Sequence, residues 1–185
     1  FTPKGEVKSL PRGATPVDFA YFIHTDVGHQ CVGARVNGRL VPLRTKLANG
    51  DIIEILTQPG HKPSRDWLNF VTTSRARNKL KHFIHSEEKS RSLDLGRRLF
   101  DKEVRRFGVD RARATDEALT GIAGEYGAQK ADDLLAAIGY GKVTARAVLA
   151  RLVGQDAWKD KGPDGALASV VKRVFQAKRA GHAGT

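Results

Sequence analysis

Two groups of side chains in this 185-residue chain have the chemistry to bind an anion. The first lies in the polar segment 24–30, where His24 and His29 stand five positions apart after a stretch with helical character. An imidazole can stack on a base, donate to a phosphate or bond a 2′-hydroxyl. The same residues could instead cap the preceding helix and shape a turn, and the residue types by themselves favour this structural role.

The second group lies on a predicted basic helix. Arg75, Lys79 and His82 share one face because they are spaced at i, i+4 and i+7, and Arg77 and Lys81 flank that face. The opposite face is apolar and carries Ala76, Leu80, Phe83 and Ile84. Such a helix can bind phosphates, an acidic protein or a membrane surface, or it can present a solvated face. Membrane binding is disfavoured, because a folded helical domain would already use the apolar face.

Neither catalysis nor metal binding is indicated by the sequence. Gly141 is followed by Lys142, but the rest of a phosphate-binding loop is missing, and the common dinucleotide, hydrolase and zinc-protease motifs do not occur. Cys31 lies in an apolar segment, where a thiol is usually inert. His82 and His85 could share a helix face, yet no third or fourth ligand accompanies them. We therefore expect no catalytic residue, no metal and no cofactor.

The charge of the chain favours anionic partners. Lys and Arg number 32 against 20 Asp and Glu, which gives a formal charge of +12. Residues 62–108 hold 13 basic and 6 acidic side chains, so the excess is concentrated around the basic helix. Nucleic acid, an acidic protein and an anionic membrane surface are all compatible with this excess.

The remaining composition argues against a secreted or integral membrane protein. There is one Cys, so no internal disulfide can form, and no apolar run is long enough for a transmembrane helix. No signal-peptide pattern is present, and we expect a cytoplasmic protein. The chain contains no Met and begins with Phe1, which predicts a piece of a longer protein.

The first sixty residues predict short strands around one helix. We expect a hairpin over 1–10, a helix over 15–24 with Thr15 as its cap, and a buried stripe of Phe19, Phe22 and Ile23. A second hairpin should turn at Asn37-Gly38, and a last strand should cover 52–56. The natural closure of this order is a β-grasp, or ubiquitin-like, fold.

A linker rich in Pro and Gly over 57–63 precedes a change from strand to helix periodicity. We therefore predict an α+β chain with a β-grasp domain at 1–61 and an all-α domain at 64–185. We expect a first helix that begins at Ser64, and a second over 92–107 that buries Leu95, Leu99 and Phe100 and ends at Gly108. Further helices are expected from 115 and over 129–138, 144–152 and 167–180.

Several blocks of residues resemble a known family. The segments Leu10-Pro11-Arg12-Gly13-Ala14-Thr15-Pro16-Val17-Asp18-Phe19, His24-Thr25-Asp26-Val27-Gly28-His29 and Asn49-Gly50-Asp51-Ile52-Ile53-Glu54-Ile55 resemble a TGS domain. The segments Pro63-Ser64-Arg65-Asp66-Trp67-Leu68, Val71-Thr72-Thr73-Ser74-Arg75 and Leu134-Leu135-Ala136-Ala137-Ile138-Gly139-Tyr140-Gly141 are similar to the RelA/SpoT-type long Rel proteins. The resemblance covers nearly the whole chain and weakens after about Arg151.

The resemblance implies a non-catalytic regulatory part of a stringent-response (p)ppGpp synthetase/hydrolase. In that family the catalytic domains lie upstream and the hydrolase carries a His-Asp pair, and none of the six His here is followed by Asp. The TGS domain would sense the 3′-CCA end of deacylated tRNA at the ribosomal A site, with His24 on the terminal adenosine. The expected CCA-binding residues are His24, Thr25, Asp26, His29 and Gln30, and the expected RNA phosphate contacts are Arg75, Arg77, Lys79 and Lys81.

The partners implied are deacylated tRNA, the ribosome with its rRNA, and the upstream catalytic domains, without a membrane. The alternative is a protein-interaction or autoinhibitory module, which docks on its own catalytic domains or on acyl carrier protein, as in some family members. The positive charge fits both interpretations, because RNA and acyl carrier protein are both acidic.

Overall fold

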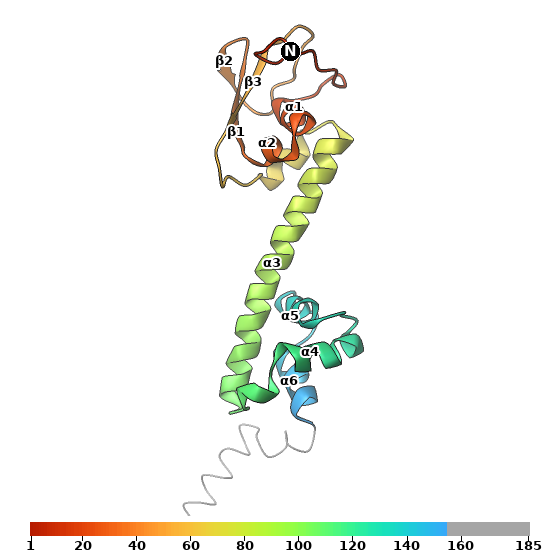
Figure 1. Ribbon diagram of the computed structural model, residues 1–185. Helices are drawn as coiled ribbons and strands as arrows, with labels where there is room; N and C mark the ends of the chain where they lie inside the picture. The colour runs from red at the N-terminus through yellow and green to blue at the C-terminus, as the bar shows by residue number, and fades with distance from the viewer. Residues whose placement is uncertain (155–185) are drawn as a thin grey trace, which may run out of the picture. The chain divides into compact units, whose positions relative to one another are not determined.

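The computed structural model describes residues 1–154, so the helix expected at 167–180 lies outside the described residues (Figure 1). The chain divides into two compact units, Phe1–Glu87 and Glu88–Thr185. The domain boundary that the sequence predicts near 62–63 falls inside the first unit, and it stays a prediction for experiment. Within residues 1–154, no helix combines the length and apolar character needed to cross a membrane.

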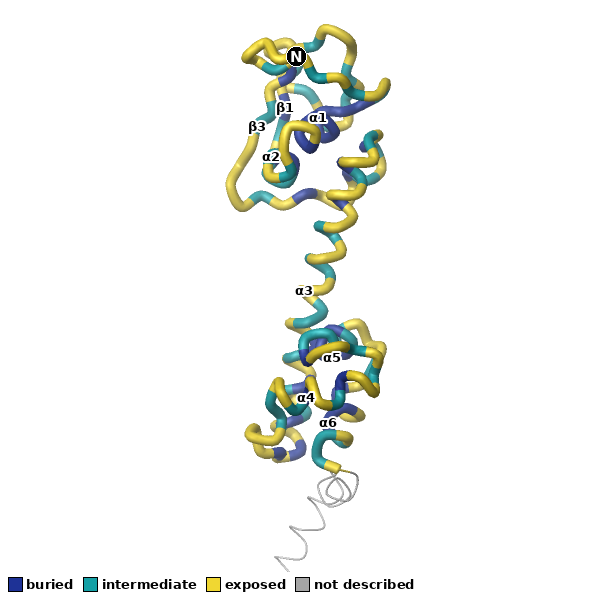
Figure 2. The backbone as a smooth tube through the Cα atoms, turned by 45° about the vertical axis from the view of Figure 1, so that its right-hand side comes forward, coloured by how far each residue is buried: buried dark blue, intermediate teal, exposed yellow. Residues whose placement is uncertain are grey.

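Helix α1 (Pro16–Ile23) opens the first unit and is largely buried (Figure 2). Thr15 and Asp18 form a reciprocal capping box, which confirms the predicted start of the helix. The expected stripe is only partly correct, because Phe22 and Ile23 are 37% and 41% exposed. A different stripe, formed by Val17, Ala20 and Tyr21 at i, i+3 and i+4, packs into the core instead, together with Phe19. The buried apolar side chains are Val17, Phe19, Ala20 and Tyr21.

The described residues form one antiparallel sheet with the order β2-β1-β3. Its strands are β1 (Cys31–Val36), β2 (Arg39–Val41) and β3 (Ile53–Thr57), and Ala34 pairs with Val41 on one side and Ile55 on the other. The predicted turn at Asn37-Gly38 is confirmed, because both residues have positive φ, 51° and 76°.

The hairpin expected at 1–10 is not formed as strands, although a turn is present there. The amide of Gly5 donates to the Thr2 carbonyl at 2.9 Å, and the Ile53 amide donates to the Phe1 carbonyl at 2.9 Å. Pro3 lacks the N–H that a continued ladder would need, so the segment meets β3 only at its first residue.

The core of the first unit extends beyond the β-grasp residues. Trp67, in the 3₁₀ helix η1 (Arg65–Asn69), and the first turns of α3 (Ser74–Arg106) join α1 and β1 in one apolar cluster. The buried members are Val17, Ala20, Tyr21, Cys31, Trp67, Val71, Ala76 and Leu80. Burial raises the pKa of Cys31 to about 11, which keeps this thiol protonated at neutral pH.

Helix α3 replaces two helices that the sequence predicts separately. The helix expected to open at Ser64 is the short η1, and α3 then runs without a break to Arg106. Gly108, at φ 59°, follows its end as predicted. Phe100 is buried as expected, but Leu95 and Leu99 are 42% and 39% exposed, because the buried stripe passes through Gly96, Phe100 and Val104.

The described part of the second unit is helical. The last turns of α3 pack with α4 (Asp116–Ala123), α5 (Ala131–Gly139) and α6 (Ala145–Val153), joined by the short η2 (Arg111–Arg113) and η3 (Gly124–Tyr126). The core includes Phe100, Val104, Phe107, Leu119, Leu134, Leu135, Ile138, Val148 and Leu149.

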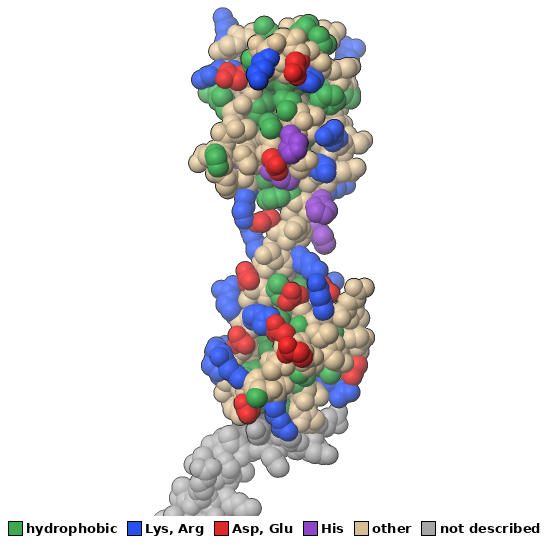
Figure 3. Space-filling view, viewed as in Figure 1, with side chains coloured by type: hydrophobic (Ala, Val, Ile, Leu, Met, Phe, Trp, Pro, Cys, Tyr) green, Lys and Arg blue, Asp and Glu red, His purple; other side chains and the backbone are tan. Residues whose placement is uncertain are grey.

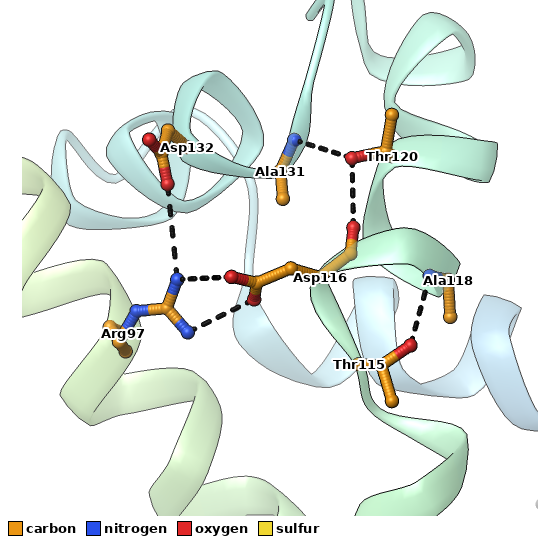
Figure 4. Close-up of polar contacts among 7 residues, drawn as sticks. All are labelled: Arg97, Thr115, Asp116, Ala118, Thr120, Ala131 and Asp132. Carbon is orange, nitrogen blue, oxygen red and sulfur yellow. Dashed lines mark hydrogen bonds and ion pairs between the residues drawn. The ribbon is translucent and has the colours of Figure 1, made fainter.

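One arginine connects three helices of this unit (Figure 4). Arg97 of α3 makes two 3.1 Å hydrogen bonds to the carboxylate of Asp116 on α4 and lies 3.8 Å from Asp132 on α5. Thr120 donates to the Asp116 carbonyl at 2.8 Å and accepts from the Ala131 amide at 3.1 Å. These bonds tie the starts of α4 and α5 together beside the apolar core.

Candidate nucleic-acid interface

The segment 24–30, which the sequence predicts as a turn, forms the short helix α2 (Thr25–His29). His24 is the last residue before it and acts as its N-cap, because its Nδ1 accepts a 3.2 Å hydrogen bond from the Asp26 amide. In the neutral ring that bond leaves the proton on Nε2. The His24 side chain is 65% exposed, so it has polar capacity left for a ligand.

Asp26 lies beside this imidazole and is also exposed. Its Oδ2 is 3.4 Å from the His24 Nδ1, and its side chain is 72% accessible. A protonated His24 would form an exposed ion pair with this carboxylate, which contributes little to stability. The two side chains are therefore held together only weakly.

His29 points in a different direction and serves the fold. Its Nδ1 lies 3.0 Å from the Tyr21 hydroxyl, and its ring centroid lies 4.8 Å from that of Phe83 on α3. The pKa of His29 is lowered, chiefly by burial; the charge of Asp26 opposes this, and Lys79 and His82 add smaller lowering effects. The neutral ring can then accept the hydrogen bond from the tyrosine hydroxyl.

The other two predicted CCA residues lie at the ends of α2. Thr25 is half-buried at its first position. Gln30 is its C-cap, with its amide donating to the Asp26 carbonyl at 2.9 Å and its carbonyl accepting from the Gln58 amide at 2.9 Å. The backbone of Gln30 thus fixes α2 to the residue that follows β3.

Gly28 allows α2 to sit against α1. A Cβ at this position would lie 2.3 Å from the Tyr21 ring, so only a glycine permits this approach. Tyr21 is fully buried, and burial raises the pKa of its hydroxyl, which stays protonated and able to donate to His29.

The basic helix is amphipathic as predicted, since Ala76 and Leu80 are fully buried in the first unit. Arg75, Lys79 and Lys81 are exposed along α3. Figure 3 shows histidine side chains in purple over the first unit and the adjoining part of α3, with Lys and Arg side chains nearby. The first turns of α3 therefore expose both cations and imidazoles, which are groups that can bind an anion.

Arg77 differs from the other predicted phosphate contacts. Its guanidinium donates to the Leu68 carbonyl at 3.1 Å and to the Val71 carbonyl at 2.6 Å, and the residue is half-buried. These bonds hold the loop after η1 against α3. The sequence contains no signal that separates Arg77 from its neighbours, because its partners are backbone carbonyls.

The structure brings the two predicted groups of residues together within the first unit. The contact between His29 and Phe83 places α2 against the apolar side of α3, and Lys79 is near enough for its charge to act on His29. Phe22 and Ile23, directly before His24, are exposed, whereas the sequence predicts them in the core. The competing stripe through Val17, Ala20 and Tyr21 is the signal that could have revealed them. We use the name α2–α3 surface for the exposed side chains around α2 and the first turns of α3, namely His24, Asp26, Arg75, Lys79 and Lys81. Arg75 and Lys79 share one face of α3, and Lys81 lies on another.

Among the described residues, no group of three His, Cys, Asp or Glu side chains is arranged to hold a metal ion.

Comparison with known proteins identifies both units. A TGS domain model matches residues 1–57, and a RelA/SpoT AH domain model matches residues 83–153. The chain is 54% identical over 157 residues to a Myxococcus xanthus protein named GTP pyrophosphokinase, covering 84% of this chain and 21% of that protein. It is 48% identical over 152 residues to a Synechocystis protein named probable guanosine-3′,5′-bis(diphosphate) 3′-pyrophosphohydrolase, covering 82% and 20%.

A third relative, from Mycobacterium tuberculosis, is named bifunctional (p)ppGpp synthase/hydrolase RelA and is 45% identical over 158 residues, covering 84% of this chain and 21% of the relative. The chain thus spans about a fifth of the length of these relatives. The matched domains are the TGS and AH domains and not catalytic ones, so the activities in these names are those of the whole relatives. The chain therefore contains a TGS domain and an AH domain of the stringent-response RelA/SpoT family, and it resembles the regulatory TGS and helical region of RelA/SpoT-type (p)ppGpp synthetase/hydrolases.

Proposed function

We propose that this chain senses the 3′-CCA end of deacylated tRNA at the ribosomal A site in the cytoplasm. It relays that state to upstream catalytic domains of a (p)ppGpp synthetase/hydrolase and has no catalytic role of its own. The single observation that carries the proposal is the exposed imidazole of His24, whose Nδ1 caps the start of α2, the helix whose last residue, His29, contacts Phe83 of α3.

The chemistry of the α2–α3 surface suits an unpaired RNA end. The bases of a CCA end are free to be splayed, and His24 can donate to or stack on the terminal adenosine. Arg75, Lys79 and Lys81 supply sequence-independent attraction for the phosphates. Asp26 and Thr25 border the imidazole and can bond the terminal ribose.

Discrimination between charged and uncharged tRNA follows from the free terminal ribose. An aminoacyl ester adds bulk at the hydroxyl that a close contact with His24 would require. A surface that fits the bare ribose therefore rejects the ester, which is specificity by exclusion. This reasoning predicts that trimming the CCA end should weaken binding as strongly as aminoacylation does.

The test compares binding of deacylated and aminoacylated tRNA to the wild-type chain and to His24→Glu. Loss of one base or ribose contact lowers affinity about 5- to 150-fold, and the added negative charge should place this variant at the upper end. His85→Glu is the matched control, because it adds the same charge to an exposed position on α3. It should weaken binding to both tRNAs alike and leave their ratio unchanged.

Circular dichroism checks that both variants remain folded. Wild-type affinity and discrimination in a folded His24→Glu variant would overturn the assignment of His24.

The phosphate contacts are tested by salt dependence. Replacing Arg75, Lys79 and Lys81 together with Gln should reduce the slope of log affinity against log salt by about two to three. Arg77→Gln should instead lower stability with little change of slope, because its donors are used by backbone carbonyls. An unchanged slope in the triple variant would show that these three side chains form a solvated face and do not contact RNA phosphates.

A second candidate function is docking on the protein's own catalytic domains or on acyl carrier protein. The exposed Phe22 and Ile23 beside His24 favour it, because adjacent apolar side chains on a surface suit a protein partner. Equal binding of intact, trimmed and aminoacylated tRNA would favour this alternative. Loss of acyl carrier protein binding in Phe22→Ser would then support it directly.

A further inference from the structure

A buried carboxylate connects two distant parts of the first unit. Asp18 lies in the first turn of α1 and is 1% exposed. Its Oδ1 accepts hydrogen bonds of 2.8 Å from both the amide and the hydroxyl of Thr73. The Thr72 amide lies 3.0 Å from Oδ1 and 3.1 Å from Oδ2.

The same carboxylate also serves its own helix. Asp18 Oδ2 accepts from the amide and the hydroxyl of Thr15, each at 2.9 Å. Two threonine hydroxyls and three backbone amides thus converge on one side chain, and every one of them donates. A carboxylate, which only accepts, matches such a set, whereas an amide side chain would turn an NH₂ group towards donors.

The bonds continue from Asp18 into α3. The hydroxyl of Thr73 accepts from the Ala76 amide at 3.2 Å, and the Thr73 carbonyl accepts from the Arg77 amide at 3.1 Å. The Thr72 hydroxyl donates to the Gly13 carbonyl at 3.0 Å. The first turn of α3 is therefore bonded through Thr73 to the first turn of α1, across 55 positions of sequence.

We propose that Asp18 is a positioning residue for the α2–α3 surface. It fixes the start of α3 to α1, and so sets the spacing between the basic side chains of α3 and His24, which follows α1 directly. Asp18 is 1% exposed, so it acts on binding only through this spacing. The expected effect of Asp18 on RNA binding rests on the proposed function. Its role in fixing α3 to α1 does not.

The first measurement is hydrogen exchange at the amides of Thr72 and Thr73, in the whole chain without RNA. Loss of hydrogen bonds to a charged acceptor in Asp18→Asn should speed exchange at these two amides about 10- to 150-fold. The control is Asp51→Asn, since Asp51 is another carboxylate of the first unit that accepts from the Ala48 amide at 2.8 Å and the Asn37 side chain at 2.9 Å. This control should leave the exchange of Thr72 and Thr73 unchanged.

A second pair of variants keeps the test decisive if Asp18→Asn does not fold. Thr73→Val removes the hydroxyl that connects Asp18 to α3, and Thr73→Ser keeps it. We expect faster exchange in Thr73→Val and wild-type exchange in Thr73→Ser. Equal protection in the two variants, or wild-type protection in a folded Asp18→Asn, would overturn the proposal.

The RNA measurement uses the same variants with deacylated and aminoacylated tRNA. Thr73→Val should lose discrimination several-fold and Thr73→Ser should restore it. If Thr73→Val discriminates like the wild type, the role of Asp18 in binding is overturned. If the wild-type chain itself does not discriminate, the proposed function fails, and the exchange data still decide whether Asp18 fixes α3.

Discussion

Alanine at Gly96 should destabilise the second unit, because α3 and α5 cross there with their backbones in contact. A Cβ on Gly96 would lie 1.7 Å from the Leu135 carbonyl oxygen and 3.0 Å from the Gly139 nitrogen. A Cβ on Gly139 would in turn lie 1.8 Å from the Ser92 carbonyl oxygen. The obstacles are backbone atoms, so a side-chain rotation cannot relieve either clash.

The magnitude follows from two opposing effects. Forcing a methyl group into a packed site typically costs about 1–3 kcal/mol, and more where the backbone must move. Replacing a helical glycine by alanine returns up to about 1 kcal/mol. The clash should prevail, because separating the helices also loosens Leu134, Leu135 and Ile138, which are buried in the same core. We expect a net loss of about 2 kcal/mol, or a fall in the melting temperature of roughly 8–16 °C.

Gly121→Ala is the matched control. Gly121 lies in α4 and is exposed, and a Cβ added there would meet no atom within 4 Å, so alanine should stabilise the unit by up to about 1 kcal/mol. Calorimetric melting gives the midpoints, and amide exchange in α5 assigns the transition to the second unit. A Gly96→Ala protein that melts with or above the wild type would refute the reasoning.

Three further predictions concern the first unit. Gly28→Ala should lower its melting temperature by several degrees, because the new methyl meets the Tyr21 ring at 2.3 Å, and a melt followed by circular dichroism checks this. The lowered pKa of His29 means that the unfolded chain binds a proton more readily than the folded one. Stability should therefore fall as the pH drops through about 6.5, and urea unfolding across pH should show a shallower fall in His29→Gln. A piece 1–87 should melt well above a piece 1–61, which lacks Trp67 and the first turns of α3. Equal midpoints would favour the domain boundary that the sequence predicts at the linker.

Local chemistry made part of this fold predictable from sequence. Thr15 caps α1, Asn37-Gly38 turns the hairpin, and Gly108 follows the end of α3, each because a short motif has a mechanism that needs only its neighbours. Local motifs did not decide which of two apolar stripes on α1 is buried. Both satisfy a helical period, and the core selected the one that includes Tyr21, which contacts α2 and β1 through tertiary packing.

Asp18 shows the limit of local motifs more directly. Its role in the capping box with Thr15 follows from a spacing of three residues, and sequence can predict it. Its bonds to Thr72 and Thr73 join residues more than fifty positions apart, and nothing in either segment indicates the other. The linker at 57–63 even suggests independence of the segments on either side of it, although Trp67 and Asp18 show how closely they are joined within the first unit.

The two imidazoles of the candidate site acquire different roles because α2 is a helix. Five positions along a helix correspond to about 140° of rotation, so side chains at that spacing cannot point the same way. His24, at the cap, is left exposed, while His29 turns inward to Tyr21 and Phe83. A five-residue helix is too short to produce a recognisable periodicity, and the low helix propensity of Gly28 argues against a helix at this position. The structure needs that glycine for the contact between α2 and the Tyr21 ring, and this contact leaves His24 exposed while His29 packs inward.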